Sequence, residues 1–333
     1  MIQLFKSNNP ATVFLIVLLA ILLHLPYLLH PQAHQIVPTD IGGYYLMQIT
    51  NAPLQNNLLL GEIVLLALII VQALLWNTFL SNVRFLPQQN FLPSFVFIIF
   101  SAVLPDFNAL SPVFFTTFIL IWMLYKMNNI YRKEKQTGAT FDLGFAVGLA
   151  SMLAAHNIFL LFFGIFGLAI LRPTTFKEWL NFIIGIFIPF FLVGTWWFYT
   201  GRFFQFEESI IGNLIFRKSF VTNLNTGFWV VSSATILMII SSYFLLSTRQ
   251  LSRLVLIRKF FNVLFHLCWI TALMWFFSTD RSLNVFYLLA IPLSFYFAYY
   301  LCIEKKTWKA DLWIGIWIAA ILFSQYFNQS KIF

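Results

Sequence analysis

Apolar residues run along this chain in long blocks, and short polar stretches separate them. Blocks of roughly 15 to 23 apolar residues are about the length that an α-helix needs to cross a bilayer. We predict eleven such spans, and three of them (91–105, 141–155 and 158–171) are short enough to tilt, thin the bilayer or pack as half-buried hairpins. The predicted spans cover residues 11–29, 58–80, 91–105, 111–127, 141–155, 158–171, 179–199, 227–247, 260–278, 284–302 and 312–327.

Composition agrees with this pattern. The chain is 60% hydrophobic and only 9% charged, with a mean hydropathy of +0.84, so 333 residues of this kind cannot hide their apolar surface in one soluble core. The two cysteines, Cys268 and Cys302, lie inside apolar blocks and suggest neither a disulfide framework nor a thiolate metal site. The predicted fold class is all-α, a polytopic membrane protein with a single transmembrane domain over residues 1–333.

Basic residues fix an orientation for these spans. If the N-terminus is cytoplasmic, fifteen of the twenty Lys and Arg residues fall on the cytoplasmic side of the predicted spans. Such a bias is typical of cytoplasmic loops, so the net charge of +9 reports topology and does not indicate a nucleic-acid partner. An odd number of spans then places the C-terminus outside. The five exceptions are Arg202, Arg217, Lys218, Arg281 and Lys331.

Two long loops lie on the predicted outer side. The first, His30–Asn57, contains one acidic residue, Asp40, and no Lys or Arg. The second, 200–226, mixes Phe and Ile with charges at roughly helical spacing, as in an amphipathic helix that lies in the interface. Together these loops can roof a cavity on the outer face.

Three outer acids are candidates for chemistry. Asp40 lies in TDIGGYYL, where it can cap a short helix or act as a general base, and the sequence leaves both open. Glu62 lies about one turn inside the second span, so it must face a wet cavity, pair with a cation, be protonated, or snorkel to the interface. Asp106 follows Pro105 at a short outer turn and can cap the helix that starts near Ser111.

Four outer cations are candidates for binding a phosphate group: Arg202, Arg217, Lys218 and Arg281. Their alternative role is to pair with nearby acids or with lipid headgroups. His30 and His34 have an i, i+4 spacing, but Pro31 lies between them and disfavours a helical metal site. No P-loop, G-x-S-x-G or dinucleotide-binding motif is present, so the sequence predicts no cofactor and gives no support for a divalent metal.

Three stretches together resemble the GT-C superfamily of polyprenyl-phosphate-sugar-dependent glycosyltransferases, in its protein mannosyltransferase and aminoarabinose transferase branch. They are TDIGGYYL after the first span, the block 110–171 with its basic span end and two short helices, and DRSLNVFYLLAIPLSFYFAYYL at 280–301. The family often has two adjacent acids in the first outer loop, whereas this chain has Asp40 alone. The chain is also similar to uncharacterised bacterial polytopic membrane proteins of this length.

The resemblance implies a protein of the bacterial inner membrane that moves a sugar from a polyprenyl-phosphate carrier to an acceptor on the outer face. It implies Asp40 as general base, with Arg217, Lys218 and Arg281 stabilising the leaving phosphate. The implied partners are membrane lipid and the lipid-linked sugar, and no nucleic acid. Two alternatives stay open: a transporter or lipid-handling permease, and a non-catalytic subunit that packs on a partner complex through its aromatic surface. Pro189 and Pro292 break later spans as in transporters, but no matched pair is seen in the first half.

Overall fold

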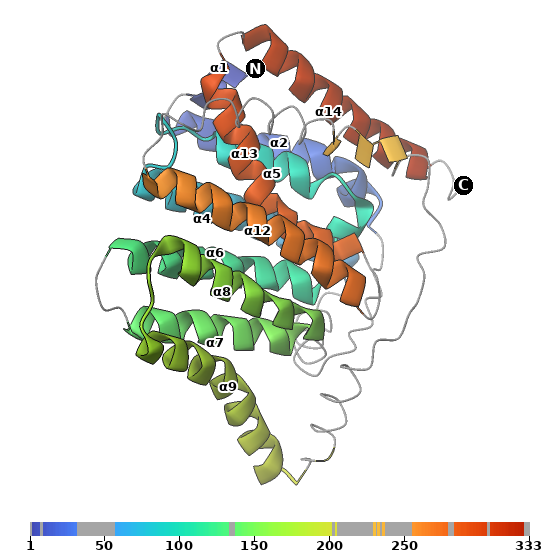
Figure 1. The fold of residues 1–333 in the computed structure, drawn as a ribbon. Helices are drawn as coiled ribbons and strands as arrows, with labels where there is room; N and C mark the ends of the chain where they lie inside the picture. Colours follow the sequence, from blue (N-terminus) through green and yellow to red (C-terminus); the bar gives the residue numbers. More distant parts are fainter. Residues whose placement is uncertain are drawn as a thin grey trace.

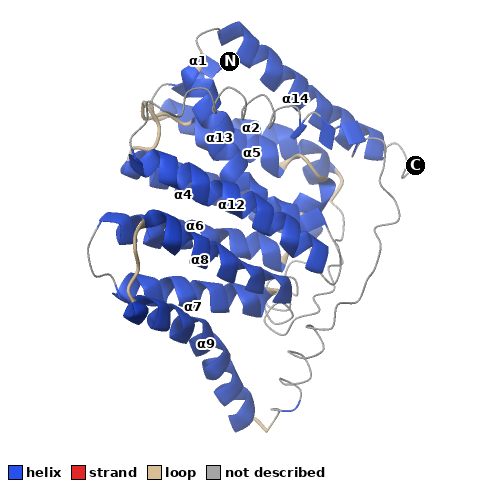
Figure 2. Cartoon of the chain, in the orientation of Figure 1, coloured by secondary structure: helices blue, strands red, loops and turns tan. Residues whose placement is uncertain are grey.

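The computed structural model describes residues 2–6, 9–31, 57–132, 137–201, 255–278, 283–304 and 307–329, with short stretches between 204 and 236. Within these residues the regular secondary structure is entirely helical, with eleven α-helices and three 3₁₀ helices (Figure 2). Six helices are long and apolar enough to cross a membrane, which confirms a polytopic helical architecture at this level. These six are Ala11–Leu29, Leu58–Val83, Pro112–Tyr131, Phe176–Tyr199, Val255–Phe277 and Leu283–Ile303.

The described helices follow the predicted spans closely, because a chain in lipid must satisfy its backbone hydrogen bonds internally. Only the predicted span 227–247 falls mostly outside the described residues. The three short blocks form helices of 10, 17 and 12 residues, and all ten residues of α5 are buried among neighbouring helices. In chain order the helices are α1 (Ile2–Lys6), α2 (Ala11–Leu29), α4 (Leu58–Val83), α5 (Leu92–Ser101), η1 (Pro105–Phe107), α6 (Pro112–Arg132), α7 (Thr137–Leu153), η2 (Ala155–Phe159), α8 (Leu160–Leu171), α9 (Phe176–Tyr199), α12 (Val255–Phe277), η4 (Leu283–Leu289), α13 (Ala290–Ile303) and α14 (Thr307–Gln329).

The helices form a bundle in which α4 and α12 lie near the middle (Figure 1). On one side of them, α5 packs against α4 and α13, and α2 packs against α4 and α5. On the other side, α8 packs against α12 and α6 packs against α7. The last helix, α14, contacts α1 and α2 at one edge, and α9 forms the opposite edge.

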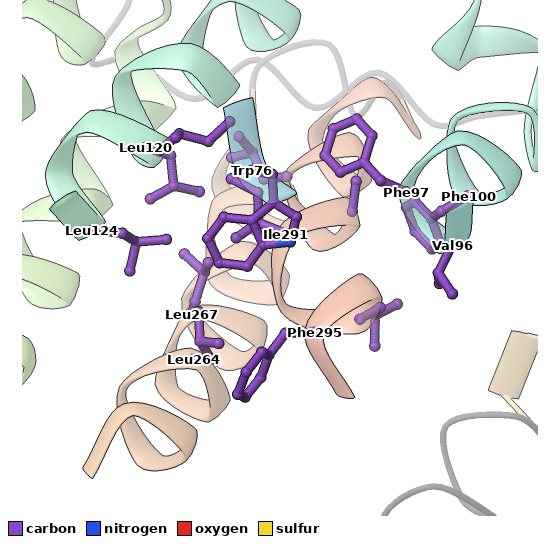
Figure 3. Close-up of a cluster of buried hydrophobic side chains, with 14 of the residues drawn as sticks. Trp76, Val96, Phe97, Phe100, Leu120, Leu124, Leu264, Leu267, Ile291 and Phe295 are labelled. Carbon is purple, nitrogen blue, oxygen red and sulfur yellow. The ribbon is translucent and has the colours of Figure 1, made fainter. Parts of the chain in front are cut away.

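The centre of the bundle is built around Trp76 of α4, whose side chain is fully buried (Figure 3). Its indole Nε1–H donates to the hydroxyl of Ser294 in α13 at 2.8 Å, so the polar atom of this large ring is satisfied in the core. Aliphatic and aromatic side chains from α5, α6, α12 and α13 surround the ring. Side chains from these four helices therefore pack around the Trp76 ring of α4.

Two helices, α7 and α9, approach each other at glycines. A Cβ atom built on Gly144 of α7 would lie 1.9 Å from the carbonyl oxygen of Phe182 in α9. One built on Gly148 would lie 2.4 Å from the carbonyl oxygen of Ile186, and one built on Gly185 would lie 2.4 Å from that of Phe141. Gly144 and Gly148 form the G-x-x-x-G spacing that lets membrane helices touch backbone to backbone.

The bundle has two chemically different ends, one with ion pairs and one with a group of buried polar side chains. At one end, which we call the basic end, Lys126 of α6 pairs with Asp142 of α7 at 2.5 Å, and Arg172 pairs with Glu178 at the start of α9. Lys259 of α12 also donates to the carbonyl of Leu171 there. At the opposite end, which we call the polar end, the C-terminal parts of α2 and α5 meet the N-terminal part of α4 and the residue that follows η1.

Candidate functional site

A buried hydrogen-bonded group joins four elements at the polar end. The Nδ2 of Asn108, just after η1, donates to Glu62 Oε2 of α4 at 2.7 Å. Because the amide nitrogen of Asn108 is used in this way, its Oδ1 accepts from His24 Nδ1 of α2 at 3.1 Å. His24 Nε2 lies 3.3 Å from the hydroxyl of Ser101 in α5, whose single hydrogen can be donated either to this nitrogen or to the carbonyl of Ile98. We call Glu62, Asn108, His24 and Ser101 the Glu62 network.

Local sequence explains why these side chains meet. Asn57 begins α4 by accepting a hydrogen bond from the backbone N–H of Leu60 at 3.2 Å, which places Glu62 in the second turn of the helix. The chain between α5 and α6 turns through η1, which starts at Pro105 and ends just before Asn108. All four residues of the Glu62 network are less than a tenth exposed, and buried polar side chains of this kind need hydrogen-bond partners within the protein.

A second buried group lies deeper in the bundle. The hydroxyl of Tyr287 in η4 donates to Gln72 Oε1 of α4 at 2.8 Å, and Gln72 Nε2 donates to the carbonyl of Phe114 in α6 at 3.0 Å. The two hydrogen bonds fix the rotation of α4 relative to η4 and α6. Because all three groups are neutral, they supply no charge. Buried polar contacts of α4 therefore occur near its N-terminal end, at Glu62, and again near its middle, at Gln72.

Of the predicted site residues, the structure describes two. Glu62 is 7% exposed and takes the side-chain amide of Asn108 as its partner, so it is neither extended to the interface nor paired with a described cation.

Asp106 is exposed in the first turn of η1, and the cap of α6 is Ser111, whose hydroxyl accepts from the N–H of Phe114 at 3.2 Å. Tyr27 is an electrostatic neighbour of both acids. The predicted residues Asp40, Arg202, Arg217, Lys218 and Arg281 lie outside the described residues.

Sequence reasoning did not single out His24, Asn108 or Ser101. The signal that could have found His24 is a histidine inside an otherwise apolar span, since an ionisable group within a span is costly unless it meets a partner. The sequence spacing pointed to His30 and His34 instead, but His30 is the residue that ends α2 and His34 is outside the described residues. Within the described parts of the chain, no three His, Cys, Asp or Glu side chains gather closely enough to hold a metal ion.

Comparison with known proteins found no matching family model, no matching curated protein and no matching solved structure. The fold itself defines the class: a multi-pass helical membrane protein with six long apolar helices among the described residues.

Proposed function

We propose that this protein is a GT-C-like glycosyltransferase of the bacterial inner membrane, which transfers a sugar from a polyprenyl-phosphate carrier to an acceptor on the outer face. The observation that carries the proposal is the position of the two described residues on either side of the Asp40 segment. His30 ends α2 and Asn57 begins α4, and both helix ends lie at the polar end, where Glu62 is buried. On this basis we assign Asp40 to the polar end.

The distribution of charged residues between the two ends of the bundle supports the orientation in this proposal. Lys126, Arg172 and Lys259 all contribute to the basic end, as expected for the cytoplasmic side. The N-terminal helix α1 adjoins this end, since the carbonyl of Phe5 accepts from the N–H of Phe91. Gln325 of α14 donates to Ala102 near the polar end, so the last described helix finishes on the outer side in this orientation.

The proposed reaction is a direct displacement at the anomeric carbon. The Asp40 carboxylate takes the proton of the acceptor hydroxyl while the acceptor oxygen bonds to the anomeric carbon. The bond from that carbon to the phosphate oxygen breaks, and the polyprenyl phosphate leaves with the electron pair, so the configuration inverts. In this proposal Arg202, Arg217, Lys218 and Arg281 stabilise the charge on the phosphate, and Glu62 and Asp106 are further substrate-binding residues.

The test compares Asp40→Asn with Asp142→Asn in a strain from which the gene has been deleted. Lipid extracts are profiled by mass spectrometry for polyprenyl-phosphate sugars, with variant levels in the membrane matched by immunoblot. We expect the deletion and Asp40→Asn strains to accumulate the same lipid-linked sugar, whereas Asp142→Asn, at the basic end, restores the wild-type profile. Full consumption of the donor by Asp40→Asn, or a deletion strain without donor accumulation, would refute the assignment.

A second candidate function is transport, and the Glu62 network favours it. Two ionisable side chains, His24 and Glu62, lie within candidate membrane spans and are linked through Asn108, an arrangement found along ion and proton pathways. In that case labelled solute should exchange across proteoliposomes that contain the purified protein, and Asp40→Asn should leave the exchange rate unchanged while Glu62→Gln reduces it.

A further inference from the structure

A pocket of about 360 Å³ lies where α4 ends, on the loop that leads to α5. It lies at the basic end, because the last turns of α4 contact Tyr125 of α6 and Phe260 of α12 through Phe79. Its polar lining comes from one guanidinium, one hydroxyl and two side-chain amides, and none of these described lining residues is acidic. These polar residues are Arg84, Ser81, Gln88 and Gln89, with Leu86 and Pro87 on the apolar side.

Arg84 occupies a backbone conformation that normally belongs to glycine. Its φ of 58° is the only positive φ among the described non-glycine residues. The N–H of Arg84 donates to the carbonyl of Ser81 and the N–H of Phe85 donates to that of Leu80, which are the two bonds of a Schellman helix end. The left-handed position of this motif favours glycine, since any side chain there clashes with its own backbone. The chain therefore keeps an arginine where a glycine would be more stable, and such strain points to a function of the side chain.

The chemistry of the pocket fits an anion with several oxygens. Arginine offers a planar fork of donors that matches phosphate, and the hydroxyl and amide groups beside it can donate as well. The Arg84 side chain is exposed and makes no ion pair or hydrogen bond with another described residue. The C-terminal carbonyls of a helix would repel an anion, but those of Leu80 and Ser81 are occupied by the Schellman bonds.

We propose that this pocket binds a phosphate group at the basic end of the bundle, carried by an anionic membrane lipid or by a soluble phosphate compound. The site is independent of the proposed glycosyl transfer, which takes place at the polar end. Arg84 is the binding residue, and its strained backbone is maintained because the left-handed turn aims the side chain from the end of α4 into the pocket.

The test uses Arg84→Gly. This substitution should raise the melting temperature of the protein but lower its affinity for the anionic ligand, so an effect on binding can be told apart from an effect on folding. Purified full-length protein in detergent is melted with increasing phosphatidylglycerol against phosphatidylcholine, and with inorganic phosphate against chloride at equal ionic strength. We expect Arg84→Gly to raise the melting temperature without ligand by roughly 1 to 2 °C. We also expect its apparent affinity for the anionic ligand to fall at least about tenfold, as for loss of a charged hydrogen-bond donor. A response to phosphatidylglycerol alone identifies the source as lipid, and a response to inorganic phosphate as well identifies a general phosphate site.

Three variants act as controls. Arg84→Ala keeps the strain and removes the charge, so it should lose the ligand response without the gain in melting temperature. Arg84→Lys should keep part of the response. Lys177→Ala removes an exposed cation of α9 at the same end and should leave the response unchanged. The proposal is overturned if Arg84→Gly binds within twofold of wild type, if Lys177→Ala weakens binding as much as Arg84→Ala, or if the wild type responds equally to the anionic and neutral ligands.

Discussion

Replacing Gly144 by alanine tests the closest helix contact in the bundle. The new Cβ would lie 1.9 Å from the carbonyl oxygen of Phe182 and 3.1 Å from the backbone nitrogen of Ile186. Since both neighbours are backbone atoms of a helix, no side-chain rotation relieves the clash, and α7 and α9 must separate by more than an ångström. The separation also breaks the matching contact of Gly185, whose own Cβ position lies 3.1 Å from the Cα of Gly144.

The expected change in the free energy of unfolding is the difference between a favourable helix-propensity effect and an unfavourable packing effect. Alanine is a better helix former than glycine by up to about 1 kcal/mol in a helix interior. Overpacking a close contact typically costs about 1–3 kcal/mol, and a rigid backbone neighbour places this case at the upper end. We therefore expect Gly144→Ala to lower the free energy of unfolding by about 1–2 kcal/mol. The control is Gly315→Ala in α14, where no heavy atom lies within 4 Å of the new Cβ, so only the favourable helix term acts.

The measurement is equilibrium unfolding in mixed detergent micelles with increasing dodecyl sulfate, followed by tryptophan fluorescence and circular dichroism. Gly144→Ala should unfold at a lower dodecyl sulfate fraction than wild type, and Gly315→Ala at an equal or higher one. If the two variants shift the transition in the same direction by the same amount, the direct contact between α7 and α9 is refuted.

Two further predictions concern buried hydrogen bonds and use the same unfolding assay. Asn108→Leu removes the donor to Glu62 and should cost about 1–3 kcal/mol, because a buried oxygen loses its partner. Glu62→Gln keeps an acceptor oxygen of similar shape and should cost less, and an equal loss in both variants would contradict the assigned bond. Tyr287→Phe removes the donor to Gln72 and should cost about 1 kcal/mol. Tyr125→Phe, at a tyrosine that is 50% exposed, should be neutral, and a neutral Tyr287→Phe would show that the hydroxyl bond adds nothing.

The positions of the helices were largely predictable from the sequence. The apolar block 11–29 matches α2 residue for residue, and 284–302 matches η4 and α13 to within one residue at each end. The apolar blocks and the helices coincide because lipid offers the backbone no hydrogen-bond partner, so an apolar block of this length must be helical. The ends differ more where polar residues continue a helix past its apolar block: α6 runs on to Arg132, beyond the predicted end at residue 127.

The partners within the bundle were not predictable in the same way. In a soluble helix, an apolar stripe shows which face is buried, but in lipid both the outward and the inward face are apolar. The rotation of α4 that brings Glu62, Gln72 and Trp76 inward therefore leaves little trace in its sequence. Of these three residues, only Glu62 is recognisable from the sequence, because a carboxylate inside a span is unusual on its own. The amide of Asn108, which satisfies Glu62, comes from a loop 46 residues away along the chain.

The 3₁₀ segment η4 gives one membrane span a second pitch. Seven consecutive 3₁₀ residues are unusual, and they rise about 14 Å instead of the roughly 10 Å that the same residues would cover as α-helix. They also turn about 20° more per residue, so relaxation of η4 to α-helix with α13 held still would turn Leu283 by roughly 140° and retract it by about 3.5 Å. Tyr287 lies within this segment and is bonded to Gln72 of α4. The Tyr287–Gln72 hydrogen bond thus ties the segment of tighter pitch to α4, so the rotation of this span about its axis depends on a single side-chain contact with its neighbour.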